Sequence, residues 1–144
     1  KKARKTLMGR PSWDQIWSEF SEMISQRSVD TKHKVGVVIV TDDNTQVLSV
    51  GYNGDQKGGP NCRESLDRGK SGFIHAEINA LIKCDYNHPK VKKMYMTLSP
   101  CDVCAKAIIN AGIAEVIYAE IYPMSNGINI LKKAGVVVRK HVTR

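Results

Sequence analysis

The strongest constraint on the fold of this 144-residue chain is a pair of short clusters rich in metal-binding residue types. His75-Ala76-Glu77 is the first cluster, and Pro100-Cys101-Asp102-Val103-Cys104 follows after twenty-two intervening residues. A structural zinc site takes four protein ligands, whereas a catalytic site keeps three and leaves a position for water. Two Cys, one His and a nearby carboxylate favour the catalytic kind. The fold must therefore bring the two clusters together around one ion.

The remaining cysteines leave two alternatives open. The chain has four cysteines, and only Cys101 and Cys104 form a close pair. A disulfide between these two is one alternative, although a domain of this size does not need such a bridge. The other is a structural zinc site completed by a fourth ligand, in which Glu77 would have no role. The candidates for that fourth ligand are Cys62, Cys84 and His88.

The hydrophobic pattern predicts one α/β domain over residues 1–144. Ser12 and Gln15 suggest a helix cap, and the apolar residues from Trp13 to Ile24 follow helical spacing. The aromatic residues among them are expected to pack in the core. The further predicted elements are a hairpin of strands 35–40 and 46–52, a helix over 75–84, a strand over 91–98, a helix over 101–111, a strand over 116–119, a helix ending near 134 and a strand over 136–138. This order predicts a three-layer α/β/α sandwich with a central mixed five-stranded sheet.

Composition and charge narrow the class of protein. No apolar run reaches the roughly 18 residues of a membrane span, and the chain begins with basic residues rather than a signal sequence. We therefore expect a soluble, cytoplasmic protein (in the host cytoplasm if the source is a virus) with no membrane partner. The net charge of +8 comes partly from the two ends, and residues 1–9 are expected to form a basic flexible tail. A solvated surface explains this charge more simply than a nucleic-acid partner.

The position of the ligand clusters suggests a chemical role for each residue. Cys101 and Cys104 are three residues apart, so they share one face of the first turn of a helix. The positive end of a helix favours thiolates, as a bound metal does. Zinc lowers the pKa of bound water from about 15.7 toward about 7. Glu77, left without a metal bond, would take the proton of that water and pass protons to a ring nitrogen and a departing amine.

These residues resemble the H-x-E…P-C-x-x-C signature of the zinc-dependent cytidine deaminase superfamily. The resemblance implies that His75, Cys101 and Cys104 bind one Zn²⁺ and that Glu77 shuttles protons while water replaces the amino group of cytosine. Flanking segments are similar to the deoxycytidylate (dCMP) deaminase branch. These segments are 10–14, 27–28, 35–36, 51–54 and 79–80.

The resemblance to the dCMP branch implies a substrate and regulators. Members of this branch convert dCMP to dUMP, which feeds thymidylate synthesis. They are often homohexamers that dCTP activates and dTTP inhibits, and a triphosphate effector can bring Mg²⁺ with it. We therefore expect an allosteric enzyme of pyrimidine nucleotide biosynthesis.

The resemblance also implies contacts with the substrate. Asn53 would bind the sugar hydroxyl, and the backbone of Ala76 and the residue Ser99 would contact the pyrimidine. Tyr122 would help to hold the phosphate. The plainer interpretations are a turn residue for Asn53 and ordinary core packing for Tyr122.

A long polar stretch, residues 54–72, carries five glycines and separates the predicted hairpin from the first ligand cluster. Such a stretch within a small domain is usually functional or mobile. Its basic residues Lys57, Arg63 and Arg68 are candidates for phosphate or effector contacts.

Two positions depart from the family pattern. Asp30 stands where relatives often have a cysteine, which argues against a second, structural zinc. Pro123 and Met124 stand where the family commonly has charged residues, so we expect subunit contacts or the effector response to differ.

Two other functions remain open. A tRNA adenosine deaminase, or another cytosine or nucleoside deaminase of the superfamily, would use the same metal chemistry, but the long insertion between Asn53 and His75 argues against the tRNA enzyme. A non-catalytic, zinc-stabilised nucleotide-binding module would not require Glu77.

Overall fold

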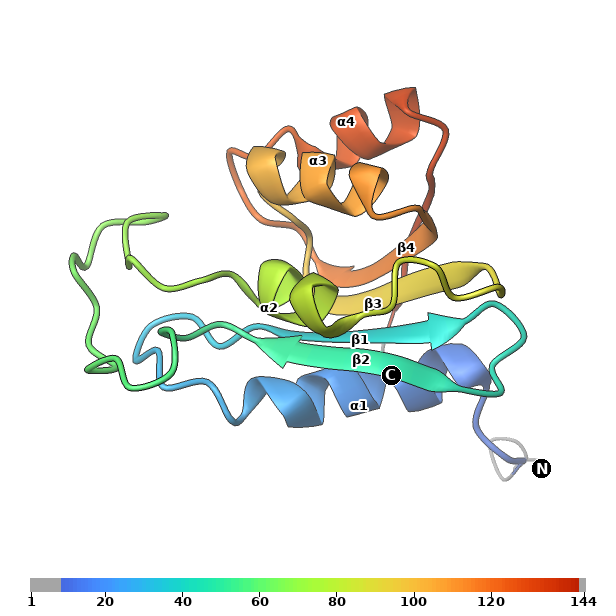
Figure 1. The fold of residues 1–144 in the computed structure, drawn as a ribbon, viewed down its shortest axis with the longest axis horizontal. Helices are drawn as coiled ribbons and strands as arrows, with labels where there is room; N and C mark the ends of the chain where they lie inside the picture. Colours follow the sequence, from blue (N-terminus) through green and yellow to red (C-terminus); the bar gives the residue numbers. More distant parts are fainter. Residues whose placement is uncertain (1–8, 143–144) are drawn as a thin grey trace.

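The computed structural model describes residues 9–142, so the predicted basic tail lies outside the described residues except for Gly9. The elements follow in the order α1 (Trp13–Ser25), β1 (Gly36–Thr41), β2 (Val47–Tyr52), α2 (Ala76–Lys83), β3 (Lys92–Leu98), α3 (Asp102–Asn110), β4 (Ile113–Glu120), α4 (Gly127–Lys133) and β5 (Val137–Lys140). Figure 1 shows α1 on one face of the sheet and α2, α3 and α4 on the other. The predicted three-layer sandwich is confirmed.

The five-stranded sheet has the order β2-β1-β3-β4-β5. Strand β1 pairs antiparallel with β2 and with β3, whereas β3, β4 and β5 run parallel. The sheet is therefore mixed, as the sequence predicts. The β3–α3–β4 crossover brings the start of α3 to the carboxyl end of β3, where ligands of open α/β sheets commonly bind.

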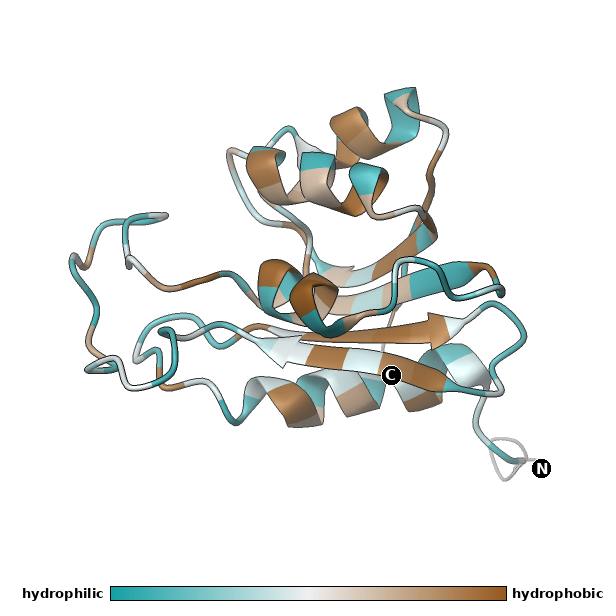
Figure 2. Cartoon of the chain, viewed as in Figure 1, coloured by the Kyte–Doolittle hydropathy of each residue, from teal (hydrophilic) through white to brown (hydrophobic). Residues whose placement is uncertain are grey.

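Strand β1 is buried along its whole length because helices cover both faces of the sheet. Successive side chains of a strand point to opposite faces. Val37 and Ile39 accordingly pack in the cluster that includes α2 and α3, while Val38 and Val40 pack in the cluster beneath α1. The hydrophobic character of this strand is visible in Figure 2.

Helix α1 begins as predicted, with the Ser12 hydroxyl accepting a hydrogen bond from the Gln15 backbone N–H. The prediction that its aromatic residues pack in the core was wrong for Trp13, which is 53% exposed, and Met23 is also exposed, at 68%. The buried residues of the helix are the small Ser21 and Ser25. Because these serines face the sheet, Met23 turns toward solvent.

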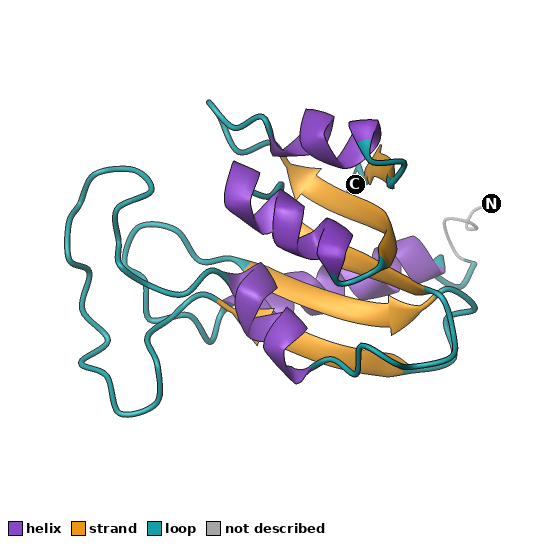
Figure 3. Cartoon of the chain, turned by 45° about the horizontal axis from the view of Figure 1, so that its top comes forward, coloured by secondary structure: helices purple, strands orange, loops and turns teal. Residues whose placement is uncertain are grey.

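The stretch between β2 and α2 has little regular structure and extends away from the sandwich (Figure 3). Its two ends are held together by an isolated bridge between Gly54 and Ile74. We call residues 54–72 the flap. Within residues 9–142, no helix combines the length and the apolar character that crossing a bilayer requires.

Candidate metal centre and substrate pocket

Both ligand clusters lie at the first residues of helices. His75 is the N-cap residue of α2, and Cys101 is the N-cap residue of α3. The thiol sulfur of Cys101 accepts a hydrogen bond from the backbone N–H of Cys104 at 3.4 Å. The cap therefore satisfies one early N–H of α3 and directs the Cys101 sulfur toward the axis of the helix start, where positive backbone groups favour a thiolate.

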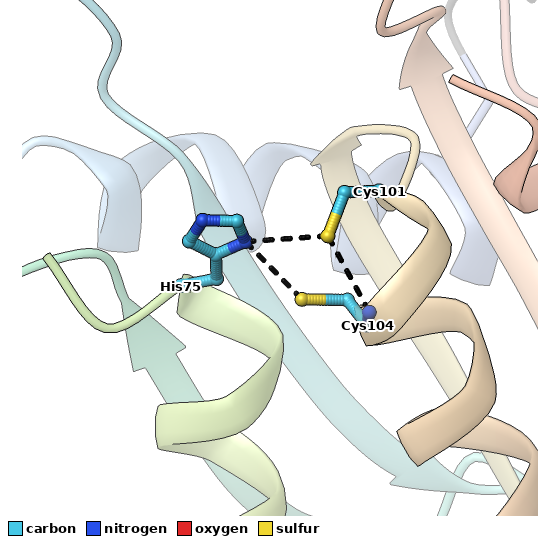
Figure 4. A group of neighbouring side chains, drawn as sticks. All are labelled: His75, Cys101 and Cys104. Carbon is cyan, nitrogen blue, oxygen red and sulfur yellow. Dashed lines mark hydrogen bonds between the residues drawn. The ribbon is translucent and has the colours of Figure 1, made fainter. Parts of the chain in front are cut away.

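The three predicted metal ligands meet. The Nδ1 atom of His75 lies 3.2 Å from the Cys104 sulfur and 3.5 Å from the Cys101 sulfur (Figure 4). Zinc bonds of about 2.3 Å to sulfur and about 2.0 Å to nitrogen place such atoms roughly 3.5 Å apart in a tetrahedral site. The observed spacing fits that requirement. One His nitrogen and two Cys sulfurs are also the soft donor set that zinc prefers.

The two alternatives for the cysteines are not supported. All four cysteines are free, so Cys101 and Cys104 form no disulfide. Among the described residues, the group able to hold a metal consists of His75, Cys101 and Cys104 and includes none of the candidates for a fourth protein ligand. The described residues therefore offer three ligand atoms at this place, the number that a catalytic zinc site takes from its protein.

The two thiols differ in their protonation. The pKa of the Cys101 thiol is lowered to about 4, mainly because its sulfur forms a hydrogen bond with the side chain of Cys104. The same hydrogen bond, together with burial, raises the pKa of Cys104. Zinc binds thiolates, so a bound divalent ion would favour the deprotonated form of both sulfurs.

Glu77 is the second residue of α2 and lies in its first turn, close to His75, Cys101 and Cys104. Its side chain is buried, with the residue only 4% exposed, and burial raises its pKa to about 7. A carboxyl group with a pKa near neutrality can both accept and give up a proton under physiological conditions. Among the described residues, the group whose ligand atoms lie together is His75, Cys101 and Cys104, and Glu77 lies beside it.

A pocket opens onto this centre and is lined by His75, Glu77 and Cys101. The structure places all four residues predicted to contact the substrate in the same lining. They are Asn53, Ala76, Ser99 and Tyr122. The sequence pattern therefore identified positions that the fold brings together from β2, α2 and the loops after β3 and β4.

Two of these side chains are already hydrogen-bonded within the protein. The hydroxyl of Ser99 accepts a hydrogen bond from the Tyr122 backbone N–H at 2.7 Å, which joins the loops that follow β3 and β4. The Asn53 amide bonds to the backbone of His33 and Val35. Both residues thus shape the pocket wall as well as line it.

The three flap residues predicted to contact phosphate or an effector are placed differently. Arg68 lines the pocket, and its guanidinium carbon lies 5.9 Å from the centre of the Tyr122 ring. Arg63 also lines the pocket, but its guanidinium is paired with Asp30. Lys57 does not line the pocket.

Sequence reasoning gave no site role to six of the lining residues: Asp30, His33, Val35, Gly69, Ser71 and Leu98. His33 lines the pocket but belongs to no motif, so no local signal could have identified it. In the sequence, Asp30 stands out only as a departure from the family pattern that argues against a second zinc. In the structure it lines the substrate pocket.

Comparison with known proteins agrees with this geometry. The family model for the cytidine and deoxycytidylate deaminase zinc-binding region matches residues 11–120. The deoxycytidylate deaminase of Saccharomyces cerevisiae is 32% identical over an alignment of 143 positions, which covers 91% of this chain but only 45% of the yeast protein. The human deoxycytidylate deaminase is 32% identical over an alignment of 145 positions, which covers 92% of this chain and 81% of the human protein.

Among solved structures, the dCMP deaminase of cyanophage S-TIM5 in complex with dCMP and dUMP is similar, with a TM-score of 0.80 and 32% identity. The match covers 92% of this chain and 99% of the phage protein. The metal centre, the fold and these matches agree, and the chain belongs to the deoxycytidylate deaminase branch of the zinc-dependent cytidine deaminase superfamily.

Proposed function

We propose that the protein converts dCMP to dUMP by hydrolysis and releases ammonia. The observation that carries this proposal is the buried Glu77 beside the three-ligand centre, at a pocket that also contains Asn53 and Ser99. The similarity to a dCMP deaminase whose structure contains dCMP and dUMP supports the choice of substrate.

The chain's own residues divide the chemistry between them. His75, Cys101 and Cys104 would hold zinc, which when bound acts as a Lewis acid and lowers the pKa of water. Glu77 accepts a proton from the attacking water and gives protons to the ring nitrogen and to the leaving amine. Overall, the water oxygen forms the new bond to C4 of cytosine, and the broken C–N bond releases ammonia. The pKa of about 7 for Glu77 suits a group that must act first as a base and then as an acid.

The pocket lining suggests how dCMP is held. The backbone of Ala76 and the residue Ser99 contact the pyrimidine in this proposal, and Asn53 contacts the sugar hydroxyl. Arg68 is the best candidate for the 5′-phosphate, because it lines the pocket and its guanidinium makes no protein salt bridge within the described residues. Arg63 is less suitable, since Asp30 already neutralises its charge.

Regulation and assembly extend the proposal. By resemblance to the branch, the protein supplies dUMP for thymidylate synthesis in the cytoplasm and works as a homohexamer. In this proposal dCTP, accompanied by Mg²⁺, activates it and dTTP inhibits it, with Lys57, Arg63 and Arg68 as candidate contacts. Adding dCTP should then shift the dCMP saturation curve, whereas a hyperbolic curve that neither nucleotide changes would remove the allosteric part.

A substrate panel tests the activity. Zinc-loaded protein would be assayed with dCMP, dCTP, cytidine and a tRNA anticodon stem-loop, and the release of ammonia or the deaminated product would be measured. We expect dCMP to have the highest kcat/KM. Turnover confined to the RNA would instead identify a tRNA deaminase, and no turnover by protein with a full complement of zinc would favour a binding module.

A further inference from the structure

A buried ion pair joins the flap to the segment that follows α1. The Nη1 atom of Arg63 lies 2.7 Å and 2.6 Å from the two carboxylate oxygens of Asp30. The side chains are only 6% and 3% exposed. Removing one partner of such a pair is costly because the other charge stays buried and unpaired.

From this pair we infer that Asp30 is a positioning residue: it sets the orientation of the Asn53 amide and, through Arg63, holds the flap against the substrate pocket. This inference rests on the proposed function, since Asn53 is proposed to contact the sugar of dCMP.

Arg63 organises the flap itself. Its Nε atom donates to the carbonyl oxygen of Ser65 at 2.9 Å, and Nη2 donates to that of Asp67 at 3.3 Å. One guanidinium therefore closes the 63–67 turn and binds Asp30 at the same time. The turn leads directly to Arg68, so the place of the proposed phosphate contact depends on this pair.

Asp30 also organises its own segment. Its Oδ1 atom accepts hydrogen bonds from the backbone N–H groups of Lys32 and His33, and its Oδ2 atom accepts one from the Asn53 side chain at 3.3 Å. Burial opposes ionisation of this carboxyl group, but the hydrogen bonds from Lys32, Arg63 and His33 hold its pKa below the ordinary value. Asp30 is thus an anion surrounded by donors.

The Asn53 amide can take only one orientation in this network. Its Nδ2 atom faces two acceptors, the Asp30 carboxylate and the carbonyl oxygen of His33, which lies 2.8 Å away. Its Oδ1 atom faces a donor, the N–H of Val35, at 2.9 Å. A flipped amide would place donor against donor and acceptor against acceptor. Asp30 therefore helps to fix which group Asn53 offers to a ligand.

The network lies in the pocket wall but apart from the metal chemistry. Asp30, His33, Asn53 and Arg63 all line the pocket. Within residues 9–142, no hydrogen bond links the Asp30 carboxylate to a metal ligand or to Glu77. Disturbing Asp30 should therefore weaken the positioning of the substrate more than the binding of zinc.

The variant Asp30→Asn tests this role. The Asn side chain has the size of Asp, but it replaces one accepting carboxylate oxygen by a donating NH₂ group, which would face the donors that surround Asp30. We expect kcat/KM for dCMP to fall by up to roughly 100-fold, chiefly through KM, with zinc content unchanged. Arg63→Gln should have a similar effect, and Arg63→Lys, which keeps the charge, should recover part of the loss. In the double variant Asp30→Asn/Arg63→Gln the two losses should not add, because they remove one interaction.

Lys90→Gln is the matched control. It breaks another Lys/Arg–Asp pair, the 2.9 Å contact between Lys90 and Asp43, in which both side chains are more than 40% exposed and neither residue lines the pocket. Its kinetic constants should equal those of the wild type. A KM rise in this control as large as that in Asp30→Asn would contradict a specific role for Asp30.

Hydrogen exchange supplies a readout that does not depend on turnover. Backbone amides in residues 54–72 should exchange at least about 10-fold faster in Asp30→Asn and Arg63→Gln, while those in β1 and β3 keep their protection. Unchanged flap exchange together with an unchanged KM would overturn the inference, as would a loss confined to kcat and zinc content. If Asp30→Asn does not fold, Arg63→Gln carries the same comparison. Failure of the wild type to turn over dCMP would refute the proposed function, but faster flap exchange would still support the ion pair.

Discussion

Gly51 in β2 lies directly against Ala76, the first residue of α2. A Cβ atom at position 51 would stand 2.4 Å from the carbonyl oxygen of Ala76 and 2.6 Å from the backbone nitrogen of Ala80. Real Cβ atoms do not approach backbone so closely, so the absence of a side chain lets α2 rest on the sheet. His75 immediately precedes this helix, and the contact therefore sets the position of one metal ligand.

Gly51→Ala should displace α2 and weaken the metal centre. We expect the free energy of unfolding to fall by about 1–3 kcal/mol, as overpacked sites do, and the affinity for zinc to fall with it. Chemical denaturation and zinc competition with a chelator measure the two effects. Gly54→Ala is the control, because a Cβ there would meet nothing within 4 Å. If Gly51→Ala has the same stability and zinc affinity as the wild type, the close contact between β2 and α2 does not determine the position of the metal centre.

Arg68→Gln tests the proposed phosphate contact. Charge-assisted hydrogen bonds contribute about 1.5–3 kcal/mol, so kcat/KM for dCMP should fall roughly 10- to 100-fold. Turnover of deoxycytidine, which has no phosphate, should change little. Lys70→Gln removes the same charge from the flap at a residue outside the pocket lining and should leave both substrates unaffected. A loss of equal size for dCMP and deoxycytidine would place Arg68 in another role.

Asp14 links α1 to the sheet and makes stability depend on pH. Hydrogen bonding from Arg139 is the main cause that lowers its pKa to about 2, with a further contribution from the Tyr95 hydroxyl at 2.6 Å. A carboxyl group with a lowered pKa stabilises the folded state above its ordinary value of 3.8, and this stabilisation is lost as the pH falls toward 2. Asp14→Asn should therefore show a shallower fall in unfolding free energy between pH 4 and pH 2. Parallel curves for the two proteins would exclude this contribution.

Much of the fold followed from local patterns in the sequence. The β-branched run before residue 41 predicts a strand buried on both faces, and helices indeed cover both sides of β1. The predicted positions of the ligand clusters at helix starts also match the structure, in which His75 and Cys101 are the N-cap residues of α2 and α3. The predicted start of β4 at residue 116 was late, since the strand begins at Ile113. Ala114 and Glu115 interrupt the apolar pattern, so the sequence gives no signal for the first residues of this strand.

The wall of the pocket could not be predicted in the same way. Asp30 and Arg63 are 33 positions apart, and neither belongs to a periodic pattern or a motif that indicates its partner. Their pairing depends on where the flap returns to the segment after α1, which is a property of the tertiary fold. The exposure of Met23 has a similar origin, since close packing of small serines in α1 determines which apolar residues turn outward.

The direct test of the central claim compares the wild type with Glu77→Gln, both loaded with one zinc ion per chain. Gln keeps the shape of the buried side chain but cannot carry protons between water, the ring nitrogen and the leaving amine. We expect formation of dUMP from dCMP to fall by roughly 10²- to 10⁴-fold, with zinc content and thermal stability close to those of the wild type. Equal rates of ammonia release by the two proteins at equal zinc content would contradict the account.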